Sequence, residues 1–358
     1  MICAVSFRPS LLWRRIAFTS IFLSSAAVFA DETLWKMYVE TGTQAYEHRR
    51  YATAETIFLA ARTEAEGFGL NDVRLATTLF QLARVYSAEN EYEKAEQHYR
   101  RAIEIWDTVS APASIDFANA LNELGNLYYQ NNRGPDAQQC YTQALKIREE
   151  RKGPAHPDLI IPLTNLAGNL RNQKKYDVAE PVYKRAQDIA EKYLDPDDLK
   201  VADVLSKEAD NFYDEAKYGE AEPLYRRALE IKAKNQRSEN DPVVISSIER
   251  LAVTLFEQEK FSQSRPLVEQ AIAILEKNNQ PQDSALPLTF LGNICEKLRK
   301  YEEAENAYKR ALDAVGIDNS AALRTLENYS RMLRDLKREP EAQAYEAHIA
   351  KIRDGQKH

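Results

Sequence analysis

Two short patterns of apolar and small residues alternate along the chain, and each has the spacing of one helical face. The first is Leu-Ala-x-x-Tyr at residues 82–86, and the second is Tyr-x-x-Ala-x-x-x-Tyr-x-x-Ala at residues 92–102. Spacings of three and four residues place these side chains on the same side of an α-helix. The small residue in each pattern lets a partner helix approach closely. Together the two segments predict a helix–turn–helix hairpin.

The hairpin pattern recurs about eight times, which predicts one repeat protein rather than two or three separate globular domains. The second pattern is centred on residues 54, 95, 137, 179, 221, 264, 304 and 342, a period of about 42 residues. The first pattern is altered in two copies, at Thr41-Gly42 and at Glu208-Ala209. A single hairpin cannot bury its apolar face alone, so neighbouring hairpins are expected to stack. We predict one solenoid over residues 31–353, followed by a polar tail at 354–358.

Three of the second helices carry a proline at the same place, at Pro181, Pro223 and Pro266. Proline has no backbone N–H to donate, so it is tolerated in the first turn of a helix, where that group has no partner. The three helices are therefore expected to begin only three or four residues earlier, near Asp177, Gly219 and Ser262. Subtracting two short loops from each repeat leaves helices of roughly 16–19 residues.

Several segments resemble the longer repeats of the tetratricopeptide repeat family. The motif Ala-Glu-Pro-x-Tyr occurs at residues 179–183 and 221–225, and the linker Gly-Pro-Ala-His-Pro-Asp occurs at residues 153–158. These motifs are similar to the kinesin-light-chain type of repeat, which is longer than the usual period of ~34 residues. The resemblance covers nearly all of residues 34–353. It implies an all-α, right-handed superhelical solenoid that binds other proteins.

The composition agrees with a helical repeat protein, and the net charge excludes one class of partner. The 358 residues include only 11 Gly, which favours helices over tight turns, and 19 Tyr, which suggests one aromatic position used repeatedly. Lys and Arg number 48 against 55 Asp and Glu, giving a net charge of −7. Broad binding to a phosphate backbone needs a dense basic surface, so nucleic acid is not expected as a partner.

The first thirty residues have the pattern of a secretory signal peptide. Arg8, Arg14 and Arg15 precede or border an apolar run over residues 16–30, and no acidic residue occurs. The run is shorter than the ~20 residues that span a bilayer comfortably, and it ends in small residues. We expect cleavage after Ala30 and a periplasmic or secreted protein without a membrane span; an uncleaved N-terminal anchor is the alternative. Cleavage would leave 45 basic residues against 55 acidic ones.

The usual signatures of catalysis and metal binding are missing from the sequence. The five histidines lie in separate repeats or in the tail, and none forms a His-Glu-x-x-His motif. The glycines at residues 67–69 lack the strand–helix context of a nucleotide loop, and no Gly-x-Ser-x-Gly motif occurs. Cys140 and Cys295 stand four repeats apart, too far for a disulfide. We therefore expect no enzyme activity, no metal site and no cofactor.

The resemblance also implies that the first helix of each repeat lines a concave groove. Residues that flank the Leu-Ala pair then face this groove, whose centre we place at repeats 3–5. Asparagine can donate to and accept from an extended peptide backbone, while tyrosine and arginine suit partner anchoring. The candidate binding residues are Arg84, Asn122, Asn126, Tyr129, Thr164, Asn165, Arg171, Asp210, Tyr213 and Asn293. Further flanking positions are Phe80, Ser206, Glu249, Phe256, Glu327 and Arg331.

The favoured function is a non-catalytic scaffold of the cell envelope or periplasm that binds a protein or peptide in this groove. A carboxylate clamp like that of chaperone-tail-binding relatives is not expected, because Val39 and Thr43 occupy the positions where it begins. Two alternatives stay open: a structural subunit of an envelope assembly or export complex, and an accessory glycan-binding protein. For glycan binding, only Tyr129, Tyr213 and Phe256 offer aromatic platforms. The candidate residues are also of the types found on any solvated helix face, and the oligomeric state stays open.

Overall fold

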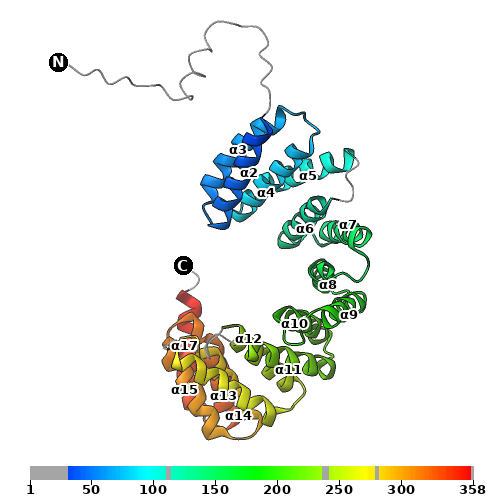
Figure 1. The fold of residues 1–358 in the computed structure, drawn as a ribbon. Coiled ribbons are helices and arrows are strands. Elements are labelled where there is room, and N and C mark those ends of the chain that lie inside the picture. Colours follow the sequence, from blue (N-terminus) through cyan, green and yellow to red (C-terminus); the bar gives the residue numbers. More distant parts are fainter. Residues whose placement is uncertain (1–30, 110–113, 236–241, 279–281, 356–358) are drawn as a thin grey trace, which may run out of the picture. The chain divides into compact units, whose positions relative to one another are not determined.

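The computed structural model describes residues 31–109, 114–235, 242–278 and 282–355, and this part of the chain is built from helices without any strand (Figure 1). Sixteen α-helices, α2 to α17, follow one another with two short 3₁₀ helices between them. The prediction of an all-α protein is confirmed. The predicted signal peptide at residues 1–30 lies outside the described residues and stays a prediction. The last helix continues to Gly355, into the segment expected to be a polar tail.

The α-helices pair in chain order into eight hairpins, one for each predicted repeat. The first four pairs are α2 (Glu32–Glu47) with α3 (Tyr51–Glu66), α4 (Val73–Ala88) with α5 (Tyr92–Thr108), α6 (Ile115–Gln130) with α7 (Gly134–Lys152), and α8 (Ile160–Asn172) with α9 (Tyr176–Tyr193). The last four are α10 (Leu199–Asp214) with α11 (Tyr218–Lys234), α12 (Pro242–Glu257) with α13 (Phe261–Lys277), α14 (Ala285–Lys297) with α15 (Tyr301–Val315), and α16 (Leu323–Asp335) with α17 (Glu339–Gly355). Three first helices, α8, α14 and α16, have 13 residues and are shorter than expected.

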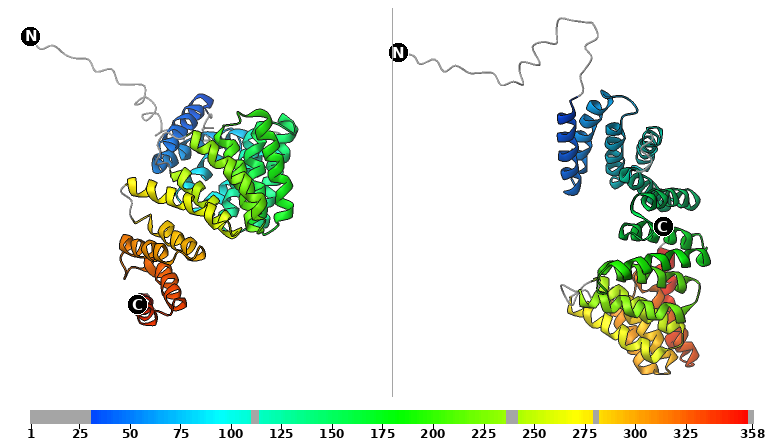
Figure 2. Two further views of the ribbon diagram at one scale, coloured as in Figure 1. Left: turned by 90° about the horizontal axis from the view of Figure 1, so that it is seen from below. Right: turned by 45° about the vertical axis from the view of Figure 1, so that its right-hand side comes forward.

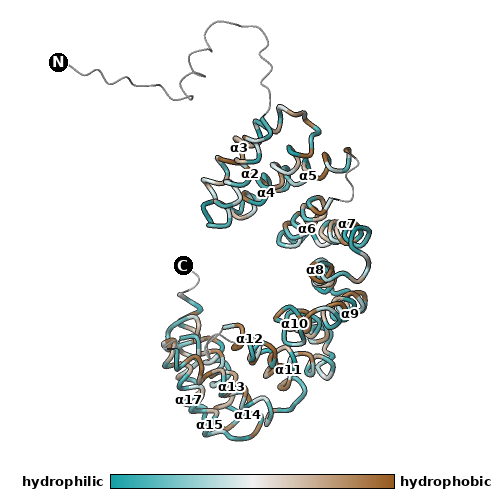
Figure 3. The backbone as a smooth tube through the Cα atoms, in the orientation of Figure 1, coloured by the Kyte–Doolittle hydropathy of each residue, from teal (hydrophilic) through white to brown (hydrophobic). Residues whose placement is uncertain are grey.

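The predicted centre of every second helix is buried at the crossing with its first helix. All eight centres are 0% exposed: Ala54, Ala95, Ala137, Ala179, Ala221, Ser264, Ala304 and Ala342. The residue four positions later is buried beside most of them, as Tyr99 and Tyr183 are. Figure 3 shows hydrophobic and hydrophilic residues mixed along the helices, as expected for surfaces that pack on one side only. None of the described helices is long and apolar enough to cross a membrane.

Side-chain caps fix where several first helices begin. Asp31, Asp72, Ser114 and Asp198 each accept a hydrogen bond from a backbone N–H in the first turn that follows. These N–H groups have no partner inside the helix, so the cap supplies one and stabilises the helix by about 1 kcal/mol. The residue at which each of these four first helices begins is therefore determined by the local sequence.

The prolines of the second helices lie deeper than the sequence suggested. The three helices begin at Tyr176, Tyr218 and Phe261, one residue before the expected positions, so each proline falls inside the helix rather than in its first turn. Each proline removes one backbone hydrogen bond. All three are exposed to solvent, so water can satisfy the carbonyl that loses its partner.

The turn inside each hairpin contains one residue in the left-handed conformation, and none of the eight is glycine. They are Arg49, Asn90, Asn132, Lys174, Ala216, Glu259, Arg299 and Lys337. After each of them the next N–H bonds back to a carbonyl five residues earlier, as Lys217 does to Phe212 at 2.8 Å. This is a Schellman-type helix end. The low glycine count therefore does not mean few tight turns, and that part of the sequence argument was wrong.

Contacts divide the chain into two compact units, residues 1–111 with α2 to α5 and residues 112–358 with α6 to α17. Within each unit the second helix of one hairpin packs on the first helix of the next (Figure 2). First helices of neighbouring repeats also contact one another, α2 with α4, α6 with α8, α8 with α10, and α14 with α16. No pair of described second helices makes comparable contacts. Side chains join α12 to α10 through Arg250 and Asp210, and to α14 through Phe256 and Phe290. We call the surface formed by the first helices of a unit the first-helix face.

Candidate functional site

A hydrogen bond from a core tyrosine to a first helix recurs in three hairpins of the second unit. The hydroxyl of Tyr141 donates to Asn126 at 2.8 Å, and the hydroxyl of Tyr308 donates to Asn293 at the same distance. Tyr225 donates to Asp210 at 2.5 Å. Burial raises the pKa of Tyr225, and the neighbouring Asp210 carboxylate adds to this effect. Three of the predicted groove residues thus hold their own hairpin together.

Amide side chains link the first helices α6 and α8. Asn165 donates from Nδ2 to the side-chain oxygens of Asn122 at 3.3 Å and Asn126 at 3.4 Å. Asn122 is only 8% exposed, and Thr164 is buried and donates to the carbonyl of Ile161. These predicted binding residues are brought together, but much of their hydrogen-bonding capacity is used between repeats.

Arg171 sits at the centre of an ion-pair cluster on the same face. It pairs with Asp214 at 2.7 Å and with Asp210 at 3.2 Å, and Arg250 pairs with Asp210 at 3.2 Å. Burial alone would lower the pKa of Arg171, but the two carboxylates outweigh it and raise the pKa. The cluster joins α8, α10 and α12, so Arg171 is committed to contacts between repeats.

Two predicted residues lie apart from these networks. Arg84, in the first unit, stacks on the ring of Tyr46 at 4.3 Å and donates to Gln81 at 2.8 Å. Tyr129, at the end of α6, is 37% exposed. It is the most exposed aromatic residue among the predicted binding residues.

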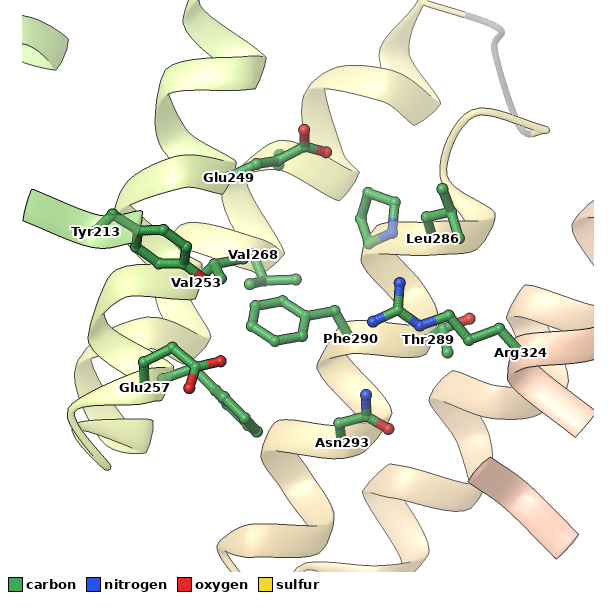
Figure 4. A pocket seen from close by; sticks show the side chains of 13 residues that line it. Tyr213, Glu249, Val253, Glu257, Val268, Leu286, Thr289, Phe290, Asn293 and Arg324 are labelled. Atoms are coloured by element: carbon green, nitrogen blue, oxygen red, sulfur yellow. The ribbon is translucent and has the colours of Figure 1, made fainter. Parts of the chain in front are cut away.

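A cavity of about 420 Å³ opens on the first-helix face of the second unit, and we call it the groove cavity (Figure 4). Its walls come from α10, α12, α13, α14 and α16. Four residues singled out from the sequence line it: Tyr213, Glu249, Phe256 and Asn293. The cavity lies in repeats 5–8, later in the chain than the expected centre at repeats 3–5. Sequence reasoning missed Val253, Glu257, Leu286, Pro287, Thr289, Phe290 and Arg324, which also line it.

The floor of the groove cavity is apolar and partly aromatic. The ring centroids of Phe256 and Phe290 lie 5.1 Å apart, and Phe256 makes an edge contact with Phe261 at the same distance. Leu286, at the rim, is 60% exposed. Leu286 therefore adds exposed apolar surface at the opening of the cavity, next to the packed phenylalanines. Of the lining residues that were missed from the sequence, only Phe290 carried a signal, because it directly precedes the Leu291-Gly292 pair of the first-helix pattern.

Charged groups stand at the sides of this floor rather than on it. Glu249 and Glu257 come from α12, whereas Arg324 comes from α16 and lies on the opposite side of Phe290 (Figure 4). Burial raises the pKa of the Glu249 carboxyl. The arrangement suits recognition of a small apolar group that carries charge. The described residues contain no cluster of metal-ligating side chains.

A separate buried carboxyl lies under the same face. Glu208 replaces the leucine of the first-helix pattern and is 4% exposed. Burial raises its pKa to about 7, and nearby Lys184 only partly opposes this. One carboxyl oxygen, Oε2, has no hydrogen-bond partner among the described residues. Cys140 and Cys295 are also buried, and neither forms a disulfide.

Comparison with known protein families follows the repeats along the chain. A model of the tetratricopeptide repeat matches residues 38–108, 116–192 and 158–234, and two other models of this repeat match residues 244–282 and 288–322. The chain belongs to the tetratricopeptide repeat family. Repeats of this family bind other proteins, so the fold is that of a protein-interaction scaffold. No curated protein matches the sequence.

Solved structures agree with this family assignment. A Podosopora anserina protein with nearly identical kinesin-light-chain TPR-like repeats is 21% identical, with a TM-score of 0.51, over 57% of this chain and 97% of that one. BtubC (BKLC) from P. vanneervenii is 21% identical, with a TM-score of 0.53, over 70% and 93%. The C-terminal part of a TPR repeat-containing protein from Cytophaga hutchinsonii is 15% identical, with a TM-score of 0.56, over 80% and 98%. At these identities the likeness concerns the fold, and it confirms the predicted kinesin-light-chain-like repeats.

Proposed function

We propose that this tetratricopeptide repeat protein is a non-catalytic scaffold that binds a peptide segment of a partner protein on the first-helix face of its second unit. The observation that carries the proposal is the groove cavity, to which four consecutive repeats contribute side chains. Its volume is within the range of roughly 300–1,000 Å³ typical of ligand pockets. A peptide side chain placed there would cover Leu286 and the edge of Phe290.

The contacts of the other predicted groove residues support this location. In repeats 3–5 Asn122, Asn126 and Arg171 bond to neighbouring helices, so a partner would have to displace existing hydrogen bonds to use them. Losing a typical intramolecular hydrogen bond without replacing it costs about 0.5–1.5 kcal/mol. In repeats 5–8 the apolar floor is open instead.

A cell-envelope or periplasmic location is part of the proposal and rests on the basic and apolar pattern of residues 1–30. Expression of the full chain, followed by fractionation and mass measurement of the product, tests it. The expected product lacks residues 1–30 and is recovered from the periplasm or the medium. An uncut product in the membrane fraction would instead indicate an N-terminal anchor.

The binding site is tested by placing the photo-crosslinking amino acid p-benzoylphenylalanine at position 286 of the full chain. Position 161 is the matched control, because Ile161 is similarly exposed near the start of a first helix but does not line the cavity. We expect a discrete crosslinked partner band from position 286 and not from position 161. Equal labelling from both positions, or none from 286, would contradict a groove partner. A band from 161 alone would favour a structural subunit that uses another surface.

A further inference from the structure

The α12 wall of the groove cavity carries two acidic side chains that the chain itself leaves without a counter-charge. Glu249 and Glu257 are two helical turns apart and line the same cavity. Among the described residues, neither carboxylate has a hydrogen bond or an ion pair. Arg250 follows Glu249 in sequence but pairs with Asp210 at 3.2 Å. Burial raises the pKa of Glu249, so its ionised form is under-solvated as it stands.

The opposite wall does not neutralise these carboxylates. Arg324 extends from α16 across the far side of Phe290, close to Thr289 and Asn293 (Figure 4). Between the two walls lies the apolar floor, with Phe290 at its centre and Leu286 at its rim. An occupant therefore meets hydrophobic surface first and acidic groups on the α12 side.

We propose that the groove cavity binds a partner segment in which an apolar side chain stands next to a lysine or arginine. The inference rests on the proposed function and specifies the chemistry of its partner. The apolar side chain covers Phe290 and Leu286 and removes their surface from water. The adjacent cation reaches Glu249, whose half-buried carboxylate makes a stronger ion pair than an exposed one, and the exposed Glu257 adds negative charge on the same wall. An acidic residue at the same place would meet two like charges.

Three fluorescein-labelled synthetic peptides test the proposal by fluorescence anisotropy with the purified full chain. They are Gly-Ser-Phe-Arg-Ser-Gly, the same peptide with Glu in place of Arg, and the same peptide with Ser in place of Phe. We expect the Phe-Arg peptide to bind roughly tenfold more tightly than either of the others. Raising the salt concentration is expected to reduce its advantage over the Phe-Glu peptide and not its advantage over the Ser-Arg peptide.

Matched variants assign the effect to the cavity. Glu249→Gln is expected to remove most of the preference for Arg over Glu, and Leu286→Ser to weaken the Phe-Arg peptide several-fold. Glu230→Gln and Ile161→Ser are the controls, because both residues are exposed and neither lines the cavity. Circular dichroism checks that all four variants are folded.

Equal binding of the Phe-Arg and Phe-Glu peptides, or a preference that survives Glu249→Gln, would overturn the proposed chemistry. If position 286 still crosslinks a partner in that case, the scaffold function stands and only its charge preference is wrong. If no peptide binds and position 286 yields no crosslink, both proposals fail.

Discussion

Gly125 and Tyr141 are packed so closely that no larger residue fits between their helices. A Cβ atom built on Gly125 would stand 2.7 Å from Cε1 of the Tyr141 ring. The same ring is held by the hydrogen bond from its hydroxyl to Asn126. The tyrosine therefore cannot move aside without losing a buried contact. The glycine is required by packing and not by backbone conformation.

This relationship predicts the effect of Gly125→Ala. We expect it to destabilise the protein by about 1–3 kcal/mol, since overpacking forces the ring or the helix to shift. Urea denaturation followed by circular dichroism measures the change. Gly219→Ala is the matched control: Gly219 is an exposed helical glycine whose Cβ would meet nothing within 4 Å. It is expected to stabilise by about 0.5–1 kcal/mol, as alanine usually does in a helix. Equal effects of the two changes would show that packing at Gly125 is not tight.

The tyrosine–acceptor bond predicts a difference between two otherwise similar core tyrosines. Tyr225→Phe leaves Asp210 without the hydroxyl that donates to it at 2.5 Å, and is expected to cost about 1.5–3 kcal/mol. Tyr183→Phe is expected to cost less than half of that. The fourth repeat has Gly168 where the third, fifth and seventh carry Asn126, Asp210 and Asn293, so no amide or carboxylate accepts from Tyr183 at that position. The same urea measurement compares them, and similar losses would rule out the bond to Asp210 as the cause.

The buried Glu208 predicts a pH-dependent stability. Its pKa of about 7 in the folded protein lies above the ordinary value of 4.5, so the folded state keeps the proton longer than the unfolded state does. The contribution of Glu208 to stability therefore falls as pH rises through about 4.5 to 7, by up to about 3 kcal/mol, and levels off above that. Glu208→Gln mimics the protonated carboxyl. It is expected to match the parent protein near pH 4.5 and to exceed its stability at pH 8.

Urea midpoints of the two proteins between pH 4.5 and 8 measure this difference. Glu230→Gln serves as the control, because it makes the same chemical change at an exposed glutamate of the neighbouring helix α11. A constant difference between Glu208→Gln and the parent across the pH range would mean that folding does not raise the pKa of Glu208.

Placing glycine at one of the left-handed turn positions is predicted to increase the free energy of unfolding. Ala216 has a φ of 60°, a conformation that costs a residue with a Cβ about 1 kcal/mol relative to glycine. Ala216→Gly is therefore expected to raise the free energy of unfolding by about 0.5–1 kcal/mol. Ala216→Val should lower it, because a β-branched side chain tolerates this region worst. Thermal denaturation of the three proteins gives the order, and a destabilising glycine would contradict the strain.

The repeat architecture could be predicted from the sequence because its signal is local and recurs. Small residues at helix crossings, such as Ala95 and Ala179, must follow the helical period to lie on one face, and stacking repeats that period along the chain. The left-handed turns were not predictable in the same way. Their positive φ angles are imposed by the hydrogen bonds at each helix end. Residue types such as Ala216 and Glu259 do not indicate a left-handed conformation.

The candidate site was predictable only as a face, and tertiary structure decided which residues of that face are available. Asn126 and Asn293 occupy the same place in their repeats, and both accept from a tyrosine fifteen residues later on another helix. Helical spacing shows which side a residue points to, whereas its partners depend on how neighbouring helices stack. For the same reason the groove cavity arises where Glu249 and Phe290, from successive repeats, are brought to one opening.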